Sequence, residues 1–184
     1  ISNIENLSYY FNYTLQYYDI EGLNNIKEEE IIKIIKPYMN TSIFLLPLQN
    51  ISNSIFENNW VKNLKLKIDY KNKIFIEISE FIPIGIFFFN NNKYYFNSKG
   101  KIIDYVNSKN YNNKLITFVG VSSTINAYSL LEILHKFEKD FNKKIMRATF
   151  IENRRWNLLL EGNLLLKLSE IDIKQSIENY INLT

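Results

Sequence analysis

Two neighbouring stretches of alternating apolar and polar residues constrain the fold of this chain more than any other feature. Residues 64–69 alternate Leu or Ile with Lys or Asp, and residues 74–79 alternate Ile with Phe, Glu or Ser. A period of two places successive side chains on opposite faces of a β-strand, so each stretch predicts a strand with one buried and one hydrated face. The short polar break at residues 70–72 lets the two strands pair as an antiparallel hairpin.

The residues after this hairpin predict a second sheet. Pro83 follows the second strand, and residues 84–89 then form a nearly continuous apolar run. Because proline has no backbone N–H to donate to a sheet ladder, we expect the chain to leave the first sheet at Pro83. The apolar run would then begin another sheet.

Before the hairpin, the pattern predicts one strand and two helices. Residues 13–17 alternate, which predicts a strand ending near Ile20, whereas residues 1–12 carry no firm pattern. Asn25 and Glu28 have the spacing of a capping box, so we expect a helix there whose buried face is formed by Ile31, Ile34, Ile35 and Tyr38. A second helix is predicted over residues 47–57, because proline suits a first helical turn and one face carries Leu48, Ile51 and Ile55.

The second half of the chain is rich in short strands. Turn signals separate apolar segments that predict strands, and these fall at residues 84–89, 94–96, 102–103, 115–119, 145–152, 155–160 and 164–168. Residues 122–124 offer N-caps for one amphipathic helix, whose buried side is formed by Leu130, Leu131, Leu134, Phe137 and Phe141. Ser169 and Asp172 are placed to cap a last helix, whose apolar face is formed by Ile173, Ile177, Tyr180 and Ile181.

The composition excludes several classes of protein. Hydrophobic residues make up 46% of the 184 residues, which is enough for one or two folded domains. Cysteine is absent, which excludes a disulfide framework and a thiolate zinc site. The net charge of +3 is too small and too dispersed to indicate a nucleic-acid partner, and we interpret the basic residues around 143–147 and 154–155 as an ordinary exposed strand edge. Ile, Asn and Lys are frequent in every kind of segment, as AT-rich coding would produce.

The ends of the chain predict a fragment or a processed form. Ile1 is not a natural start residue, so we expect any targeting or anchoring segment to lie upstream. Within the chain, no run approaches the ~20 apolar residues of a membrane span.

Side chains that could carry catalysis are sparse. His135 is the only histidine and is expected to be a structural residue within a helix. Without cysteine, a nucleophile would need a Ser–Lys pair, and no Ser-x-x-Lys sequence stands out. The glutamates at 28–30 suit the first turn of a helix because of its dipole, and Glu77 and Glu80 point to opposite faces of a strand. We therefore predict no enzyme activity, no cofactor and no metal site.

Two motifs make the chain resemble a known family. The first half has the order strand-helix-helix-strand-strand, and its hairpin is opened by Trp60-Val61-Lys62 and closed by Glu80-x-x-Pro83. In this it resembles the POTRA domain of the FtsQ/DivIB family. In the second half, residues 154–160 (RRWNLLL) with the glycine at 162 and residues 167–170 are similar to the RRW-x-L-x-L-x-x-G…LPE segment of alphaproteobacterial FtsQ. The resemblance extends from about residue 13 to residue 183. The chain departs from the family at turn positions, namely in the turn at 70–72 and at Asn97, Ile116 and Ser169.

The resemblance implies an α+β fold with two domains. A membrane-proximal segment (1–12) would precede a POTRA domain of β-α-α-β-β order (13–82) and an FtsQ-type, mostly antiparallel β domain with flanking helices (83–184). Family members usually continue to one more strand, which pairs beside residues 164–168 and is the main docking edge. The given chain stops before that strand, because the fragment was trimmed or because the remainder was disordered. If the strand is really absent, residues 164–168 would be left as an open edge, a template for strand addition.

The resemblance also implies a function. The chain would be the periplasmic part of a single-pass inner-membrane protein at the division septum, a non-catalytic divisome scaffold that links early and late division proteins. FtsB and FtsL-like bitopic partners would bind by β-strand addition, on a surface that includes Leu164, Leu166, Lys167, Leu168, Ile177 and Tyr180. The positions matching POTRA-side recruitment are Lys65, Lys67 and Glu80. For any one of these three, a plain solvated strand charge is an equally good interpretation.

Two alternative functions are compatible with parts of the sequence. The first is a POTRA chaperone module of outer-membrane assembly or secretion, against which the single POTRA unit and the Arg-Arg-Trp half argue. The second is an enzyme, against which the missing nucleophile and base argue.

Overall fold

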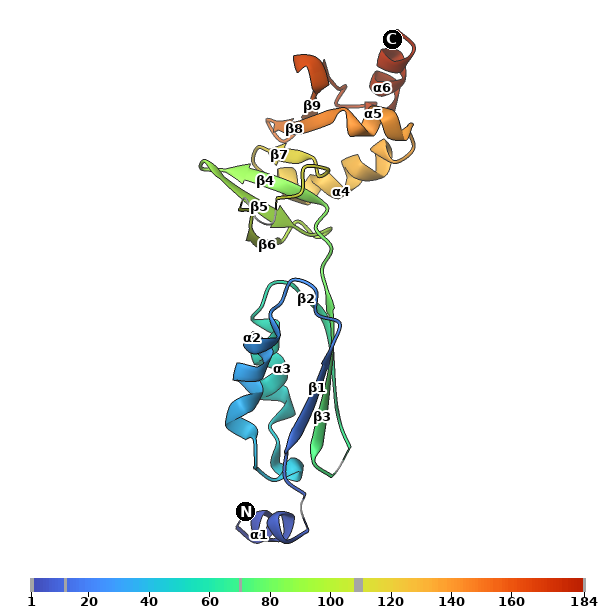
Figure 1. Cartoon of the computed structure of the whole chain (residues 1–184). Helices are drawn as coiled ribbons and strands as arrows, with labels where there is room; N and C mark the ends of the chain where they lie inside the picture. Colours follow the sequence, from blue (N-terminus) through green and yellow to red (C-terminus); the bar gives the residue numbers. More distant parts are fainter. Residues whose placement is uncertain (1, 12, 70, 108–110, 184) are drawn as a thin grey trace. The chain divides into compact units, whose positions relative to one another are not determined.

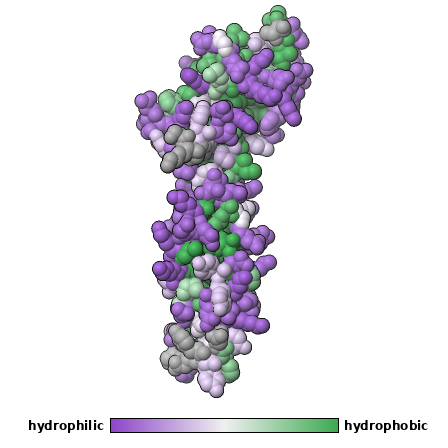
Figure 2. Space-filling view, in the orientation of Figure 1, coloured by the Kyte–Doolittle hydropathy of each residue, from purple (hydrophilic) through white to green (hydrophobic). Residues whose placement is uncertain are grey.

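The computed structural model describes residues 2–11, 13–69, 71–107 and 111–183, and the chain divides into two compact units. Unit 1 comprises Ile1–Phe81 and unit 2 comprises Ile82–Thr184. Tyr70 in the predicted hairpin turn and part of the predicted polar loop (108–110) lie outside the described residues. Figure 2 shows hydrophilic side chains over most of the visible surface of both units.

Unit 1 is a three-stranded sheet covered on one face by a pair of helices (Figure 1). The strand order is β1-β3-β2; β1 runs parallel to the central strand β3, and β2 pairs with it as an antiparallel hairpin. The elements are α1 (Ser2–Tyr10), β1 (Tyr17–Glu21), α2 (Glu28–Ile35), η1 (Lys36–Tyr38), η2 (Ile43–Leu45), α3 (Leu48–Phe56), β2 (Val61–Ile68) and β3 (Lys73–Glu80). The strand-helix-helix-strand-strand order and the hairpin predicted from the sequence are confirmed.

The core of unit 1 explains why the alternation in β3 was so regular. The three alternating isoleucines of β3 are all 2% exposed or less, and each helix contributes two fully buried residues, Ile31 and Ile35 from α2 and Ile51 and Ile55 from α3. Each such buried side chain contributes about 1.5–3 kcal/mol relative to exposure. In β2, Val61 is buried, whereas Leu64, Leu66 and Ile68 are only half-buried because β2 is an edge strand.

Two predictions for unit 1 need correction, and one segment without a predicted structure is a helix. The first strand begins at Tyr17, not at Tyr13, because the residues between them bond elsewhere: the amide of Leu15 donates to the carbonyl of Thr41 at 2.9 Å. Residues 2–10 form helix α1, although they show no regular apolar stripe. The capping box at Asn25 is absent. Helix α2 instead begins at Glu28 after Lys27, without a side-chain cap, because Glu80 captures the amide of Asn25.

Unit 2 is a seven-stranded, mostly antiparallel sheet with helices on one face (Figure 1). The strand order is β10-β9-β8-β7-β4-β5-β6; the pairs β8–β7 and β7–β4 are parallel and the other four are antiparallel. The strands are β4 (Gly85–Phe89), β5 (Asn92–Phe96), β6 (Ile102–Tyr105), β7 (Thr117–Val119), β8 (Ile145–Ile151), β9 (Arg155–Leu160) and β10 (Leu165–Lys167). The helices are α4 (Ser123–Leu134), α5 (Lys139–Lys143), η3 (Glu161–Asn163) and α6 (Ile173–Ile181).

An aromatic cluster forms the centre of unit 2. The ring of Phe118 on β7 lies 5.4 Å from the ring of Phe96 on β5 and 5.7 Å from that of Trp156 on β9, measured between centroids. Both contacts are edge-to-face, the arrangement that aromatic quadrupoles favour. The three helices add Ala127, Leu130, Leu134, Phe141 and Ile177 to the same core.

The predicted helix through Phe141 is in fact two helices. Helix α4 ends at Leu134, which places His135 at its C-cap rather than within it. The side-chain amide of Asn142 donates to the carbonyl of Leu134 at 2.8 Å, so a residue of α5 closes the end of α4. Phe141 reaches the core from α5 instead. The cap of the last helix is confirmed, because Asp172 accepts a hydrogen bond from the amide of Gln175 at 2.8 Å.

No helix in the part of the chain that the structure describes combines the length and the apolar character needed to cross a membrane.

Candidate functional site

The strand β10 lies at one edge of the large sheet and has β9 as its sheet neighbour. The carbonyl of Leu164 accepts from the amide of Leu160, and the amide of Leu168 donates to the carbonyl of Trp156, both at 2.9 Å. In an antiparallel pair the residues that bond to the neighbour alternate with residues whose backbone groups point away. The N–H and C=O groups of Leu165 and Lys167 therefore face outward along the edge.

The residues predicted for this surface divide into exposed and buried ones. Leu164 is 45% exposed and Lys167 is also exposed, whereas Leu166 and Tyr180 are half-buried. Two further predicted residues are core residues, with exposures of 2% or less: Leu168 and Ile177. Their side chains hold β10 and α6 against the sheet and present no surface themselves.

Sequence reasoning missed one residue of this edge. Leu165 is 52% exposed, and both its side chain and its backbone groups face away from the core. An exposed leucine within a strand of three residues is an apolar contact available to a partner. The period-two alternation with the half-buried Leu166 was the signal that could have found it.

The face of β8, β9 and β10 opposite the helices is basic. Register pairs point to the same face of a sheet, and the pairings place Arg147 on β8, Arg155 and Asn157 on β9, and Leu165 and Lys167 on β10 together on this face. We call these five residues the basic face. The carboxylates nearest in sequence, Glu152, Glu161 and Glu170, lie outside these strands, in the segments that flank them. The neighbouring Arg154 differs because it is ion-paired, at 2.6 Å to Glu152 and 3.8 Å to Glu170.

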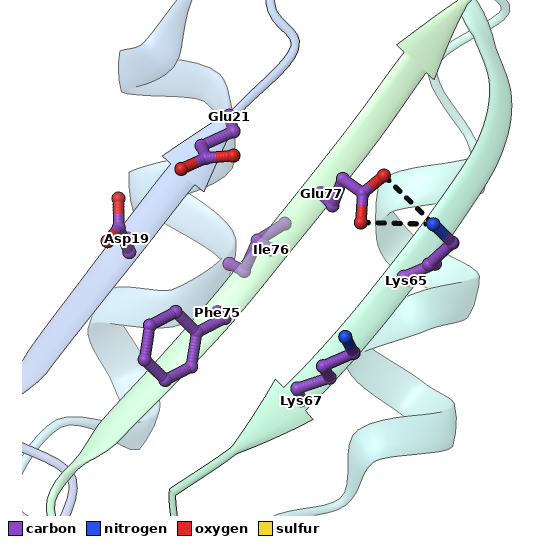
Figure 3. Close-up of a pocket in the computed structure, with 7 residues that line it drawn as sticks. All are labelled: Asp19, Glu21, Lys65, Lys67, Phe75, Ile76 and Glu77. Atoms are coloured by element: carbon purple, nitrogen blue, oxygen red, sulfur yellow. Dashed lines mark hydrogen bonds and ion pairs between the residues drawn. The ribbon is translucent and has the colours of Figure 1, made fainter.

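In unit 1, each strand of the sheet contributes charged side chains to the face that the helices leave uncovered (Figure 3). Asp19 and Glu21 lie on β1, Phe75 and Glu77 on the central β3, and Lys65 and Lys67 on β2. These residues line a shallow depression of about 330 Å³. The ammonium of Lys65 lies 2.9 and 3.1 Å from the two carboxylate oxygens of Glu77, as Figure 3 shows. The structure thus places Lys65 and Lys67 on the same face of β2, one of the two edge strands.

Glu80, the third residue predicted on this side, is engaged elsewhere. Its carboxylate accepts hydrogen bonds from the amides of Asn24 (2.8 Å), Asn25 (2.9 Å) and Ile26 (3.0 Å) and from the side-chain amide of Asn25 (2.8 Å). Partial burial raises the pKa of Glu80, but the four hydrogen bonds together outweigh it and hold the pKa below its ordinary value. Glu80 thus ties the end of β3 to the loop between β1 and α2.

Within the described ranges, no three His, Asp or Glu side chains gather as a group that could hold a metal ion.

Two family models match the chain one after the other. The model described as the FtsQ-type POTRA domain matches residues 15–81, within unit 1. The model described as the C-terminal region of cell division protein FtsQ/DivIB matches residues 88–184, more than half of the chain. The chain belongs to the FtsQ/DivIB family. The resemblance found in the sequence is confirmed, and so is the α+β fold with a POTRA-type domain and a large sheet.

Relatives of known identity agree with this assignment. The chain is 30% identical to cell division protein FtsQ of Rickettsia typhi over 180 residues, which cover 97% of this chain and 66% of that protein. It is 31% identical to FtsQ of Rickettsia conorii over 161 residues, 86% of this chain and 58% of that protein. These relatives are alphaproteobacterial, as expected. The chain spans about two thirds or less of the length of these FtsQ proteins.

A solved structure also aligns with the chain. It is the major extracytoplasmic domain of the cell division protein DivIB from Geobacillus stearothermophilus, with a TM-score of 0.41 and 9% sequence identity. The alignment covers 55% of this chain and 89% of the DivIB chain.

Proposed function

We propose that this FtsQ/DivIB chain is a non-catalytic scaffold of the divisome that binds a partner protein by strand addition at β10. The single observation that supports this most is the outward-facing backbone of Leu165 and Lys167 at the edge of the large sheet. An extended segment can complete its backbone hydrogen bonds there, and side-chain contacts on either side then select the partner.

The backbone hydrogen bonds alone are too weak to give a micromolar affinity. Two outward-facing residues offer about four hydrogen bonds, each worth ~0.5–1.5 kcal/mol net, against the ~8 kcal/mol that a micromolar affinity requires. Side chains must supply the rest, after the entropic cost of ordering the segment. The basic face lies next to the edge and offers three cations and Leu165. The bound segment is therefore expected to carry carboxylates and at least one apolar residue.

The family suggests who the partners are. We assign strand addition at β10 to FtsB and FtsL-like bitopic division proteins, with this region in the periplasm at the septum and anchored in the inner membrane. The POTRA domain (13–82) would serve recruitment through Lys65 and Lys67 on edge strand β2, and the β domain (83–184) would bind FtsB and FtsL. The FtsQ-type POTRA match and the FtsQ/DivIB C-terminal match argue against the outer-membrane chaperone alternative.

Backbone methylation of the partner tests strand addition directly. The probe is a synthetic peptide from the region of an FtsB-like protein that follows its membrane-proximal coil, and its affinity for the chain is measured by isothermal titration calorimetry. Because alternate residues of an added strand face β10, N-methylation of one parity should abolish binding and N-methylation of the other parity should leave it within about threefold. Equal effects of both parities would rule out strand addition.

Charge reversal tests the basic face in the same assay. R155E/K167E should lower the affinity at least tenfold, since coupling energies of close charge pairs at interfaces exceed ~1.5 kcal/mol. The matched control is K136E/K139E, which reverses two exposed lysines next to the ends of α4 and α5. Equal losses in both variants would mean that only net charge matters.

A further inference from the structure

One end of unit 1 carries an uncovered cluster of aromatic rings. The described rings follow one another across the surface: Tyr10 lies 5.1 Å from Phe11, Phe11 lies 6.3 Å from Tyr13, and Tyr13 lies 5.7 Å from Phe44, measured between centroids. Exposure is 85% for Tyr10, 56% for Phe11 and 53% for Phe44. We call these four residues the aromatic end. Contiguous exposed rings of this kind mark an interaction surface.

The aromatic end has a defined structure, because hydrogen bonds connect α1 and the residues after it to the segment that carries Phe44. The buried hydroxyls of Ser8 and Ser42 lie 2.6 Å apart, and the amide of Ile43 donates to the carbonyl of Tyr13 at 3.0 Å. The amide of Tyr13 in turn donates to the carbonyl of Ser8 at 2.7 Å. The rings are thus presented together by the end of α1, the segment that follows it and η2.

Cations lie at the same end of unit 1. Figure 1 shows that α1, the end of α2 and the β2–β3 turn all lie there. Lys36, which follows α2, and Lys71, in the turn, are exposed. The turn is fixed near β1, since the carbonyl of Asn72 accepts from the amide of Tyr17 at 3.0 Å. Two acidic residues also lie at this end. The carboxylate of Asp69 accepts hydrogen bonds from backbone amides of its own turn, and Glu5 is exposed on α1.

We propose that this end of unit 1 rests on the surface of an anionic lipid bilayer. Aromatic rings sit at the headgroup level of membranes, where tyrosine keeps its hydroxyl in contact with water and buries its ring. Lysines beside such rings are attracted to anionic headgroups, each by about fivefold in affinity at low salt. This contact is independent of strand addition at β10, which belongs to unit 2.

Vesicle flotation tests the proposal with the whole chain. Phosphatidylcholine vesicles with 30% phosphatidylglycerol should carry the chain upward, and F11S/F44S should reduce the bound fraction about tenfold, while K36Q/K71Q should reduce it mainly on the anionic vesicles. The matched control is F89S/Y105S, which removes two rings of unit 2 exposed to a similar degree, 54% and 49%. Circular dichroism verifies that the variants remain folded.

A reporter distinguishes lipid from other occupants. In Phe44→Trp, the emission in excess of the wild-type signal from the buried Trp60 and Trp156 should shift to the blue on anionic vesicles and be quenched by brominated lipid chains. Absence of flotation at millimolar lipid, or equal flotation of F11S/F44S and the control, would overturn the proposal. So would a concentration-dependent dimer in sedimentation that F11S/F44S abolishes, because a second copy would then cover the rings.

Discussion

Replacing Glu80 by glutamine should destabilise unit 1, although it only exchanges one carboxylate oxygen for an NH₂ group. The carboxylate receives four N–H donors, three of them from consecutive backbone amides. Glutamine keeps one acceptor oxygen and turns an NH₂ group toward donors, so about half of these hydrogen bonds are lost. Bonds to a charged group are worth ~1.5–3 kcal/mol each in protected sites, and screening by water at this half-exposed site reduces that value. We therefore expect a loss of about 1–2 kcal/mol.

The assay must report on unit 1 alone, because a chain with two units need not unfold in one step. Trp60 is buried in unit 1 beside the end of β3, where its carbonyl accepts from the amide of Phe81 at 2.8 Å. In a Trp156→Phe background, its fluorescence follows unit 1 in urea. Hydrogen exchange adds a local measurement, since Glu80→Gln should remove the protection of the amides at 24–26.

The stabilisation that Glu80 provides should depend on pH. The folded pKa of Glu80 is lowered, with burial raising it and the hydrogen bonds prevailing. Its stabilisation is therefore complete above the unfolded pKa of about 4.3 and is lost as the pH falls through the lower folded pKa. The stability difference between wild type and Glu80→Gln should be constant near neutral pH and vanish in acid.

A control isolates the effect of the loop. Glu77→Gln removes an exposed ion pair with Lys65, for which we expect no more than about 0.5 kcal/mol. Equal urea midpoints for the two variants, or unchanged exchange at 24–26, would refute the role assigned to Glu80.

Three further predictions concern single positions. Gly22→Ala should destabilise unit 1 by more than about 2 kcal/mol in urea unfolding, because the φ of Gly22 is +84° and an added Cβ would lie 1.8 Å from a carbonyl oxygen of β3. Gly162 has a similar φ of +78°, but an added Cβ would meet open space, so Gly162→Ala should destabilise unit 2 by only about 1 kcal/mol. Asp172→Ala should cost about 1 kcal/mol by loss of the α6 cap, measured by thermal unfolding, and Asp172→Asn should restore most of it. Trp156→Ala should cost unit 2 about 3–5 kcal/mol in calorimetry and leave the unit 1 transition unmoved.

The parts of the fold that the sequence predicted well are those set by local pattern. The hairpin of β2 and β3 followed from period-two alternation, and the cap at Asp172 followed from residue type and spacing. The failures have long-range causes. Asn25 and Glu28 satisfy the local capping rule, but a carboxylate more than fifty residues away binds the same amide. The spacing of Leu134, Phe137 and Phe141 fits a continuous helix and a broken one equally well.

At the candidate edge β10, too, local pattern predicts some features and long-range contacts decide the others. Period-two reasoning could place Leu165 and Lys167 on one face of a strand, but not at an edge, because strand order depends on the parallel pairings of β7 with β4 and β8. Burial of Leu168 and Ile177 also depends on how α6 returns to the sheet. Neither property has a local sequence signal.

The short strand β7 has a consequence for how unit 2 folds. The strands β4-β5-β6 and β8-β9-β10 are each contiguous in sequence and close only short loops, so each trio can assemble early. Three residues of β7 then join them, and the ring of Phe118 contacts one aromatic residue from each trio. If β7 pairs late in folding, truncating Phe118 should accelerate unfolding far more than it slows refolding. The contacts of β7 would then set the unfolding rate of the whole sheet.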